Sequence, residues 1–264
     1  MLDIALLGTG GGMPMPNRFL SSLLIKYKGK NILIDCGEGT QVSMRVLKWG
    51  FKSIDIDIVE DPKAFLGIDF LSKGVAVEEI NQKDIYNKDM IISTLKLDHS
   101  SPCIGYSLYI PRKPRFYVDK AITNGVPKKI WKKLQNGETI IHKGKTYEPS
   151  MVLGETRKGI KLCYITDTRP MDIIPEFVKD SNLFVCEGTY GDDRDWEKAL
   201  KNKHMTFSEA AELANKGNVD ELLLTHFSPS MDEPEIYKQN GKNIFNNTII
   251  GYDGFTKTLS FKEE

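Results

Sequence analysis

The sequence predicts a protein of the α/β class. Several apolar runs have the length of buried strands, and a polar or charged residue closely follows each one, as Asp167 follows the run at residues 162–165. Helical signals lie between these runs. The clearest is Thr206-Phe-Ser-Glu209, a capping box that opens a helix through Ala214 and ends near Gly217. Strand-length runs that alternate with capped helices indicate a sheet covered by helices.

The first part of the chain is expected to form three strands, at residues 3–7, 21–27 and 31–35. Val42, Val46 and Leu47 then have the spacing of a short amphipathic helix, which Gly50 ends. The glycine-rich turn at residues 8–12 invites a dinucleotide-binding interpretation. That turn leads into prolines and a second strand, however, so it offers no helix N-terminus to a pyrophosphate.

Residues 54–58 alternate isoleucine with polar residues, which predicts a half-buried strand. The nearby Asp55, Asp57, Glu60 and Asp61 could be substitute oxygen ligands for a metal. A solvated strand edge is the better interpretation, because zinc prefers nitrogen and sulfur donors. The remaining expected elements are a helix at 172–179 and strands at 91–97, 105–110, 183–187, 219–225 and near Ile249 and Leu259.

Composition excludes some classes of protein. Lys+Arg and Asp+Glu both number 36 in 264 residues, so net charge draws the chain neither to nucleic acid nor to a membrane. No apolar stretch has the length of a transmembrane helix, and no basic leader opens the chain. The four cysteines form no CxxC pair, which favours buried thiols in a reducing compartment. We therefore expect a cytoplasmic protein with no membrane partner.

Three polar residues at strand ends predict a candidate site. Asp167, His99 and His226 each follow an apolar run, and the chain has only four histidines. Taken alone, Asp167 or Thr168 is better explained as the cap of the helix that begins near Pro170. Strand-end His, Asp and His together instead indicate part of a metal site assembled from separate strands.

A basic segment interrupts the second half of the predicted sheet. Residues 111–148 carry ten Lys or Arg residues against three acids, with prolines and aromatic residues among them. A lysine run is usually a solvated face, yet this imbalance in a neutral chain is typical of a surface that contacts a phosphate backbone. The residues expected to make such contacts here are Lys128, Lys129, Trp131, Lys132 and Lys133. His142, in the same segment, is expected to be inert.

Ordered motifs along nearly the whole chain resemble ribonuclease Z. They are GTGGGMP, Arg18-Phe-Leu-Ser-Ser22, Ile34-Asp-Cys-Gly-Glu-Gly-Thr-Gln41, LDHSSPCIGYSL, CYITDTRP, LFVCEGTYGDD, KHMTFSEAAELA and LLLTHFSPSM. The resemblance implies a metallo-β-lactamase αββα sandwich, with residues 1–264 as a single domain and a basic protruding arm at about 111–158. It also implies removal of the 3′ trailer of precursor tRNA, two zinc ions and a possible homodimer.

The resemblance also assigns roles to residues. Asp167 is expected to bridge the two zinc ions, with His99 on one ion and His226 on the other. Glu187 and His204 are expected to form the pair that handles the proton of the leaving oxygen. Arg18, in the second motif, and the lysines of the arm are expected to contact tRNA.

One departure from the family limits this expectation. The family continues after its first helix into His-x-His-x-Asp-His, whereas this chain has no histidine between Met1 and Asp98. We interpret the difference as an internal deletion in the N-terminal half. Each zinc ion then keeps too few ligands, so hydrolysis is expected to be impaired or absent unless Asp57 or a dimer partner completes the site. The alternative function is a catalytically inactive protein that binds tRNA.

Overall fold

The computed structural model describes residues 1–49, 54, 56–58, 76–77, 85–87 and 90–262. This part of the chain divides into two compact units, one of residues 1–110 and 160–264 and one of residues 111–159. We call the first the body and the second the arm. None of the described helices is both long enough and apolar enough to cross a membrane.

Two sheets form the body. The β1 sheet has the order β15-β1-β2-β3-β4-β5, and the β11 sheet has the order β14-β13-β12-β11-β8-β7-β6. The strands of the β1 sheet are Leu2–Gly8 (β1), Ser22–Tyr27 (β2), Lys30–Ile34 (β3), Ile56–Ile58 (β4), Ala76–Val77 (β5) and Thr256–Leu259 (β15). Those of the β11 sheet are Ile85–Asn87 (β6), Met90–Lys96 (β7), Ile104–Arg112 (β8), Arg157–Ile165 (β11), Leu183–Glu187 (β12), Leu222–Thr225 (β13) and Thr248–Ile250 (β14).

The two sheets pack face to face through an apolar core. Ile4 and Leu23 of the β1 sheet share this core with Leu162 and Tyr164 of β11. Side chains on a strand alternate between its faces, so Cys163 and Ile165 point the other way, into a second core. The inner layers are therefore two sheets back to back, as the αββα prediction requires.

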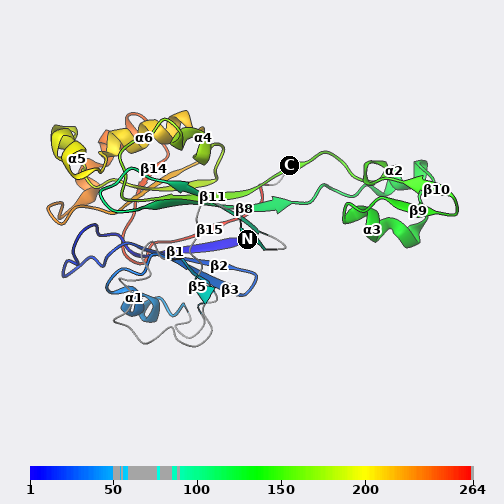
Figure 1. Cartoon of the computed structure of the whole chain (residues 1–264), viewed down its shortest axis with the longest axis horizontal. Helices are drawn as coiled ribbons and strands as arrows, with labels where there is room; N and C mark the ends of the chain where they lie inside the picture. The colour runs from blue at the N-terminus through cyan, green and yellow to red at the C-terminus, as the bar shows by residue number, and fades with distance from the viewer. Residues whose placement is uncertain (50–53, 55, 59–75, 78–84, 88–89, 263–264) are drawn as a thin grey trace. The chain divides into compact units, whose positions relative to one another are not determined.

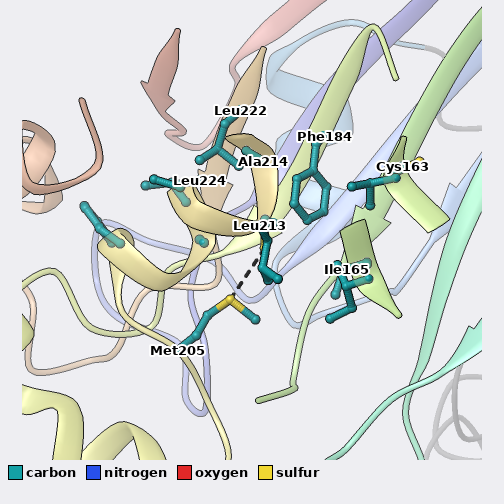
Figure 2. Packing of buried hydrophobic residues seen from close by; sticks show 14 of the residues in the cluster. Cys163, Ile165, Phe184, Met205, Leu213, Ala214, Leu222 and Leu224 are labelled. Atoms are coloured by element: carbon teal, nitrogen blue, oxygen red, sulfur yellow. Dashed lines mark hydrogen bonds between the residues drawn. The ribbon is translucent and has the colours of Figure 1, made fainter. Parts of the chain in front are cut away.

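Helices cover the outer faces of both sheets (Figure 1). The helices of the body are Thr40–Val46 (α1), Ile174–Val178 (α4), Trp196–Asn202 (α5), Phe207–Lys216 (α6) and Lys238–Lys242 (α7), with single 3-10 turns at Asp193–Asp195 (η3) and Pro234–Tyr237 (η4). Figure 2 shows Leu213 and Ala214 of α6 packed with Phe184, Leu222 and Leu224 of the β11 sheet. On the opposite side, Met44 of α1 packs against the β1 sheet.

The predicted elements occur in the predicted order, with shifts at their ends. The capping box at Thr206 is present, since its hydroxyl accepts from the Glu209 N–H while the Glu209 side chain accepts from the Thr206 N–H. The helix expected at 172–179 is shorter, and the strand expected at 219–225 begins only at Leu222. The start moves because the Val219 N–H still bonds the Ala214 carbonyl at the end of α6.

The arm has a small core of its own. Its elements are Val118–Thr123 (α2), Lys128–Ile130 (η1), Trp131–Gln135 (α3), Ile140–His142 (β9), Lys145–Tyr147 (β10) and Pro149–Met151 (η2). Buried Ala121, Ile130, Leu134 and Val152 pack together inside it. Its bounds lie close to the arm expected at 111–158, while the number of independently folding domains stays a prediction.

Candidate metal site

The site lies where strands of the β11 sheet end. Asp167 follows β11, Glu187 is the last residue of β12, and His226 follows β13. These strands are parallel neighbours, so their carboxyl ends share one edge of the sheet. His99, which follows β7, reaches the same group. The structure thus brings together the three strand-end residues that the sequence singled out.

His204 joins this group from the segment between α5 and α6. Its ring centroid lies 5.0 Å from that of His99 and 5.4 Å from that of His226. One ligand atom from each of His99, Asp167 and His204 lies within 4.8 Å of the other two. In the part of the chain that the structure describes, this is the cluster of ligand-type side chains that could hold a metal ion.

Asp167 and His226 form a tight, mostly buried ion pair. The His226 Nε2 lies 3.1 Å from the Asp167 Oδ1, and the His226 Nδ1 lies 2.9 Å from the Ser21 hydroxyl. Burial alone would lower the pKa of His226, but Asp167, Glu187 and Asp35 raise it to about 9. Burial alone would raise the pKa of Asp167, yet the three histidines hold it well below its usual value.

Glu187 is fully buried and accepts hydrogen bonds from several segments. Its donors are the backbone N–H of Thr168 at 2.6 Å, the Thr189 hydroxyl at 2.6 Å and the backbone N–H of Met205 at 3.1 Å. The His204 Nδ1 also lies 3.1 Å from this carboxylate. Glu187 therefore fixes the loop that carries Asp167 and sets the orientation of the His204 ring.

A second link joins the Asp167 loop to His204. The guanidinium of Arg169 donates to both carboxylate oxygens of Glu209 and, at 2.5 Å, to the His204 carbonyl. The side chains of Arg169 and Glu209 are only 14% and 19% exposed, so solvent screens this pair weakly. Arg169 thus holds the backbone at His204, while Glu187 holds its ring.

The glycine-rich turn of the β1 sheet packs directly against His226. A Cβ at Gly11 would lie 2.7 Å from the His226 Cδ2 and 3.0 Å from its carbonyl, so only glycine fits there. The Gly11 N–H also donates to the Phe227 carbonyl at 2.8 Å. The turn therefore supports the site through packing and a backbone hydrogen bond.

Three residues at strand ends adopt a left-handed backbone. The φ angles are 58° at Asp35, 54° at Asp167 and 60° at His226. Asp and His tolerate this region better than most residues, and the conformation costs about 1–3 kcal/mol at each position. Asp35 follows β3 and accepts the Tyr164 hydroxyl at 2.8 Å, so it faces the same end of the sandwich.

Arg18, expected to contact RNA, is held by the body. Its guanidinium donates to the Asp232 carbonyl at 2.9 Å and lies 5.6 Å from the centroid of the Phe227 ring. Burial lowers the pKa of Arg18, against the opposing effect of Asp253 and Asp232. These contacts tie the turn after β1 to the segment that follows His226.

Four lysines of the arm share one exposed face. Lys128, Lys129, Lys132 and Lys133 are all exposed on the η1–α3 helical segment. Their spacing places them together, because residues three to four apart lie on one side of a helix. Trp131 instead packs inward: its indole N–H donates to the Val126 carbonyl at 2.9 Å, and its ring lies 5.3 Å from Phe116.

The structure does not describe the side chains of the acidic residues that were considered as substitute metal ligands. Asp55, Glu60 and Asp61 lie outside the described residues, as do most residues between 50 and 89. Asp57 belongs to β4, of whose side chains nothing is described.

Some residues of the site escaped the sequence analysis. They are Gly11, Ser21, Asp35, Arg169 and Thr189. All five fall inside motifs that carried the resemblance, so membership of a motif was the available signal. The contacts of Thr189 with Glu187 and His226 could not be read from the sequence, because these residues meet only in the folded chain.

Solved structures define the class of protein. The metallo-β-lactamase fold protein YhfI from Bacillus subtilis superposes with a TM-score of 0.68 at 15% identity, covering 98% of this chain and 100% of that one. Human tRNase Z, short form, gives a TM-score of 0.65 at 18% identity, with 98% and 100% covered. The chain therefore has the metallo-β-lactamase fold, as predicted.

Curated relatives narrow this to a family. Ribonuclease Z of Alkaliphilus oremlandii is 49% identical and is matched over 99% of this chain and 100% of its own. Ribonuclease Z of Clostridium beijerinckii is also 49% identical, with all of both chains covered. No protein-family model matches the chain. On the strength of these relatives, the chain belongs to the ribonuclease Z family.

The alignments also show that this chain is short for its family. They extend over 318 and 308 positions, whereas the chain has 264 residues, so at least 54 and 44 positions have no counterpart in it. The predicted internal deletion would produce such a difference, and both the deletion and its place in the N-terminal half stay predictions.

The donors that the described residues bring together do not fit a two-zinc centre. Two ions would take about six to eight protein ligands, at three or four each. The described residues bring together His99, Asp167, His204 and His226, and Asp167 and His226 already bond each other. Four donors are enough for one ion and too few for two.

Proposed function

We propose that this chain binds precursor tRNA and removes its 3′ trailer far more slowly than the longer ribonuclease Z relatives do. Family membership supports the choice of substrate. The shortage of donors supports the loss of rate, and it is the observation that carries this proposal. In this proposal the chain still binds precursor tRNA, but its cleavage of the RNA is impaired.

The arm supports the binding step. Lys128, Lys129, Lys132 and Lys133 form an exposed positive face on a small folded unit, which suits phosphate oxygens of an RNA backbone. Trp131 contributes to the shape of this face from inside, through its contacts with Val126 and Phe116. We also propose a cytoplasmic location, supported by reduced cysteines, three of them buried.

Two residues of the site are suited to proton transfer. The Glu187 carboxylate holds the Nδ1 of His204, so the Nε2 is left as the atom that would exchange a proton with the leaving oxygen. Glu187 itself is saturated with donors and buried, which makes it a positioning residue. These contacts support the proposed roles of Glu187 and His204 at the leaving oxygen, while the described metal donors are too few for two zinc ions.

The chemical step is tested by single-turnover cleavage of a precursor tRNA with a labelled 3′ trailer, with the Alkaliphilus oremlandii ribonuclease Z assayed in parallel. We expect a rate lower by at least about 10³-fold, the size of loss seen when one electrostatic stabiliser of a transition state is removed. A comparable rate that Asp167→Ala abolishes would contradict the proposal. If a homodimer completes the site, the rate per chain will rise with protein concentration across the dimerisation range.

The binding step is tested with the same RNA by measuring Kd against salt. Replacing Lys128, Lys129, Lys132 and Lys133 with alanine should weaken binding and lower the salt slope by about 3–4, since each phosphate contact contributes about 0.7–0.9. The matched control replaces four lysines of the body, Lys179, Lys198, Lys216 and Lys238, and should leave the slope unchanged. Equal slopes for the two quadruple variants would remove the arm from the proposed binding surface.

A further inference from the structure

We infer that this chain binds one zinc-like divalent cation through His99, Asp167 and His204, in place of two ions. The ligand atoms of these residues already lie within 4.8 Å of one another. Ligands at 2.0–2.2 Å from a shared ion are at most about 4.4 Å apart, so side-chain movements of under about 1 Å close the group. Two histidines and one carboxylate form a common three-ligand set for zinc.

The hydrogen bonds of His204 favour its use as a ligand. Its Nδ1 faces the Glu187 carboxylate at 3.1 Å, which leaves the Nε2 for the ion. A carboxylate on the far nitrogen is the usual partner of a metal-bound histidine, because it fixes the tautomer and orients the ring. Arg169 adds a second restraint through the His204 carbonyl.

His226 has a different place in this arrangement. Its Nδ1 lies against the Ser21 hydroxyl and its Nε2 against Asp167, so both ring nitrogens already have protein partners. Its ring also packs against Gly11, at a distance that leaves no room for a Cβ there. His226 therefore supports the ligating carboxylate of Asp167 from behind instead of contacting the ion.

The one-ion site has a consequence that rests on the proposed function. A His204 nitrogen that holds an ion cannot at the same time exchange a proton with RNA. The residue expected to act on the leaving group is thereby withdrawn from that role, which adds to the effect of the missing donors.

The test is a metal titration of the full chain after removal of bound metal with a chelator. Zinc is counted by elemental analysis after dialysis, and Co(II) binding is followed by its visible absorption. We expect one equivalent per chain. His99→Ala and His204→Ala should each raise the Kd by at least about 100-fold, and Glu187→Gln by about 10–100-fold. His142→Ala, a histidine change in the arm, is the matched control and should bind as the parent chain does.

Circular dichroism checks that each variant is folded, and His204→Gln replaces the alanine variant if that one is not. Zero or two equivalents in the parent chain would overturn the inference. So would a pattern in which His226→Gln loses the metal and both His204 variants retain it. These readouts do not involve RNA, so failure of tRNA binding or cleavage would leave a one-ion result intact.

Discussion

The two sheets of the sandwich contribute to the site in different ways. The β11 sheet and its connections supply the described ligand-type side chains of the cluster, with His99, Asp167 and His204 all on that side. The β1 sheet supplies support: Ser21 bonds the His226 ring, and Gly11 packs against it. The β11 side therefore supplies the candidate metal ligands, and the β1 side supplies residues that pack against them or bond to them.

This difference explains how the site residues of the β11 side can keep their positions independently of the rest of the site. Residues on the β11 side are held by the core around the parallel strands β11, β12 and β13 and by hydrogen bonds to Glu187 and Arg169. None of these contacts involves residues 50–89, the part of the chain where the deletion is expected. Their positions are therefore a property of this side of the fold. Three variants and a labelling experiment test that contrast, from the largest expected effect to the smallest.

The largest effect is expected at the buried carboxylate. Glu187→Ala leaves the Thr168 and Met205 N–H groups without an acceptor and should lower the free energy of unfolding by about 3–5 kcal/mol. Urea denaturation of the metal-free chain measures this loss. Glu235→Ala, at an exposed ion pair with Lys238, is the control and should change stability by less than about 0.5 kcal/mol. A loss below about 1 kcal/mol for Glu187→Ala would show that this carboxylate does not hold the β11 side together.

Arg169→Lys should have an intermediate effect. Lysine keeps the charge but cannot hold both Glu209 oxygens and the His204 carbonyl, so the free energy of unfolding should fall by about 2 kcal/mol. The same variant should weaken Co(II) binding, because the His204 backbone loses its restraint. A stability loss with unchanged Co(II) affinity would make Arg169 structural only.

Ser21→Ala tests the support from the β1 side. The change removes the contact with His226 Nδ1 and should cost about 1 kcal/mol, less than either change on the β11 side. Thermal unfolding measures it, with Ser260→Ala, at an exposed serine after β15, as the matched control. If Ser21→Ala lowered the free energy of unfolding more than Glu187→Ala does, the β1 side would contribute more to the stability of the site than the β11 side.

Thiol labelling should show a difference in cysteine reactivity between the two sheets without changing any residue. Cys163 lies inside the β11 sheet, and burial raises its pKa to about 11, whereas an ordinary thiol ionises near 8.5. A raised pKa leaves Cys163 protonated and unreactive until the pH approaches that value. At pH 8.5 a thiol reagent should modify Cys36, which is partly exposed after β3, and should reach Cys163 and Cys186 only on unfolding. Rapid native labelling of Cys163 would show that the β11 sheet opens locally.

The sequence was informative wherever chemistry coincided with a strand end. His99, Asp167 and His226 stood out because each follows an apolar run, and parallel strands bring such residues to one edge. The capping box at Thr206 likewise predicted the start of α6, since both partners lie within one turn.

Contacts between segments that are far apart in the sequence could not be predicted from local patterns. Ser21 and His226 are 205 residues apart, and a serine in a loop carries no mark of its partner. Trp131 shows another limit of local pattern: a tryptophan among lysines was expected to contact RNA, which stays a prediction, and the structure adds that its half-buried ring packs against the core of the arm. Exposure depends on the whole small fold around a residue, which neighbouring charges do not reveal.

The hydrogen bonds of Glu187 bear on how the history of this family is interpreted. Because its carboxylate joins the segments at Thr168, Thr189 and Met205, selection for folding alone will preserve it. The same holds for Gly11, which has no room for a side chain. Descendants that have stopped cutting RNA will therefore still carry these residues unchanged, and surveys that count invariant positions as proof of enzymatic activity will count such chains among the enzymes.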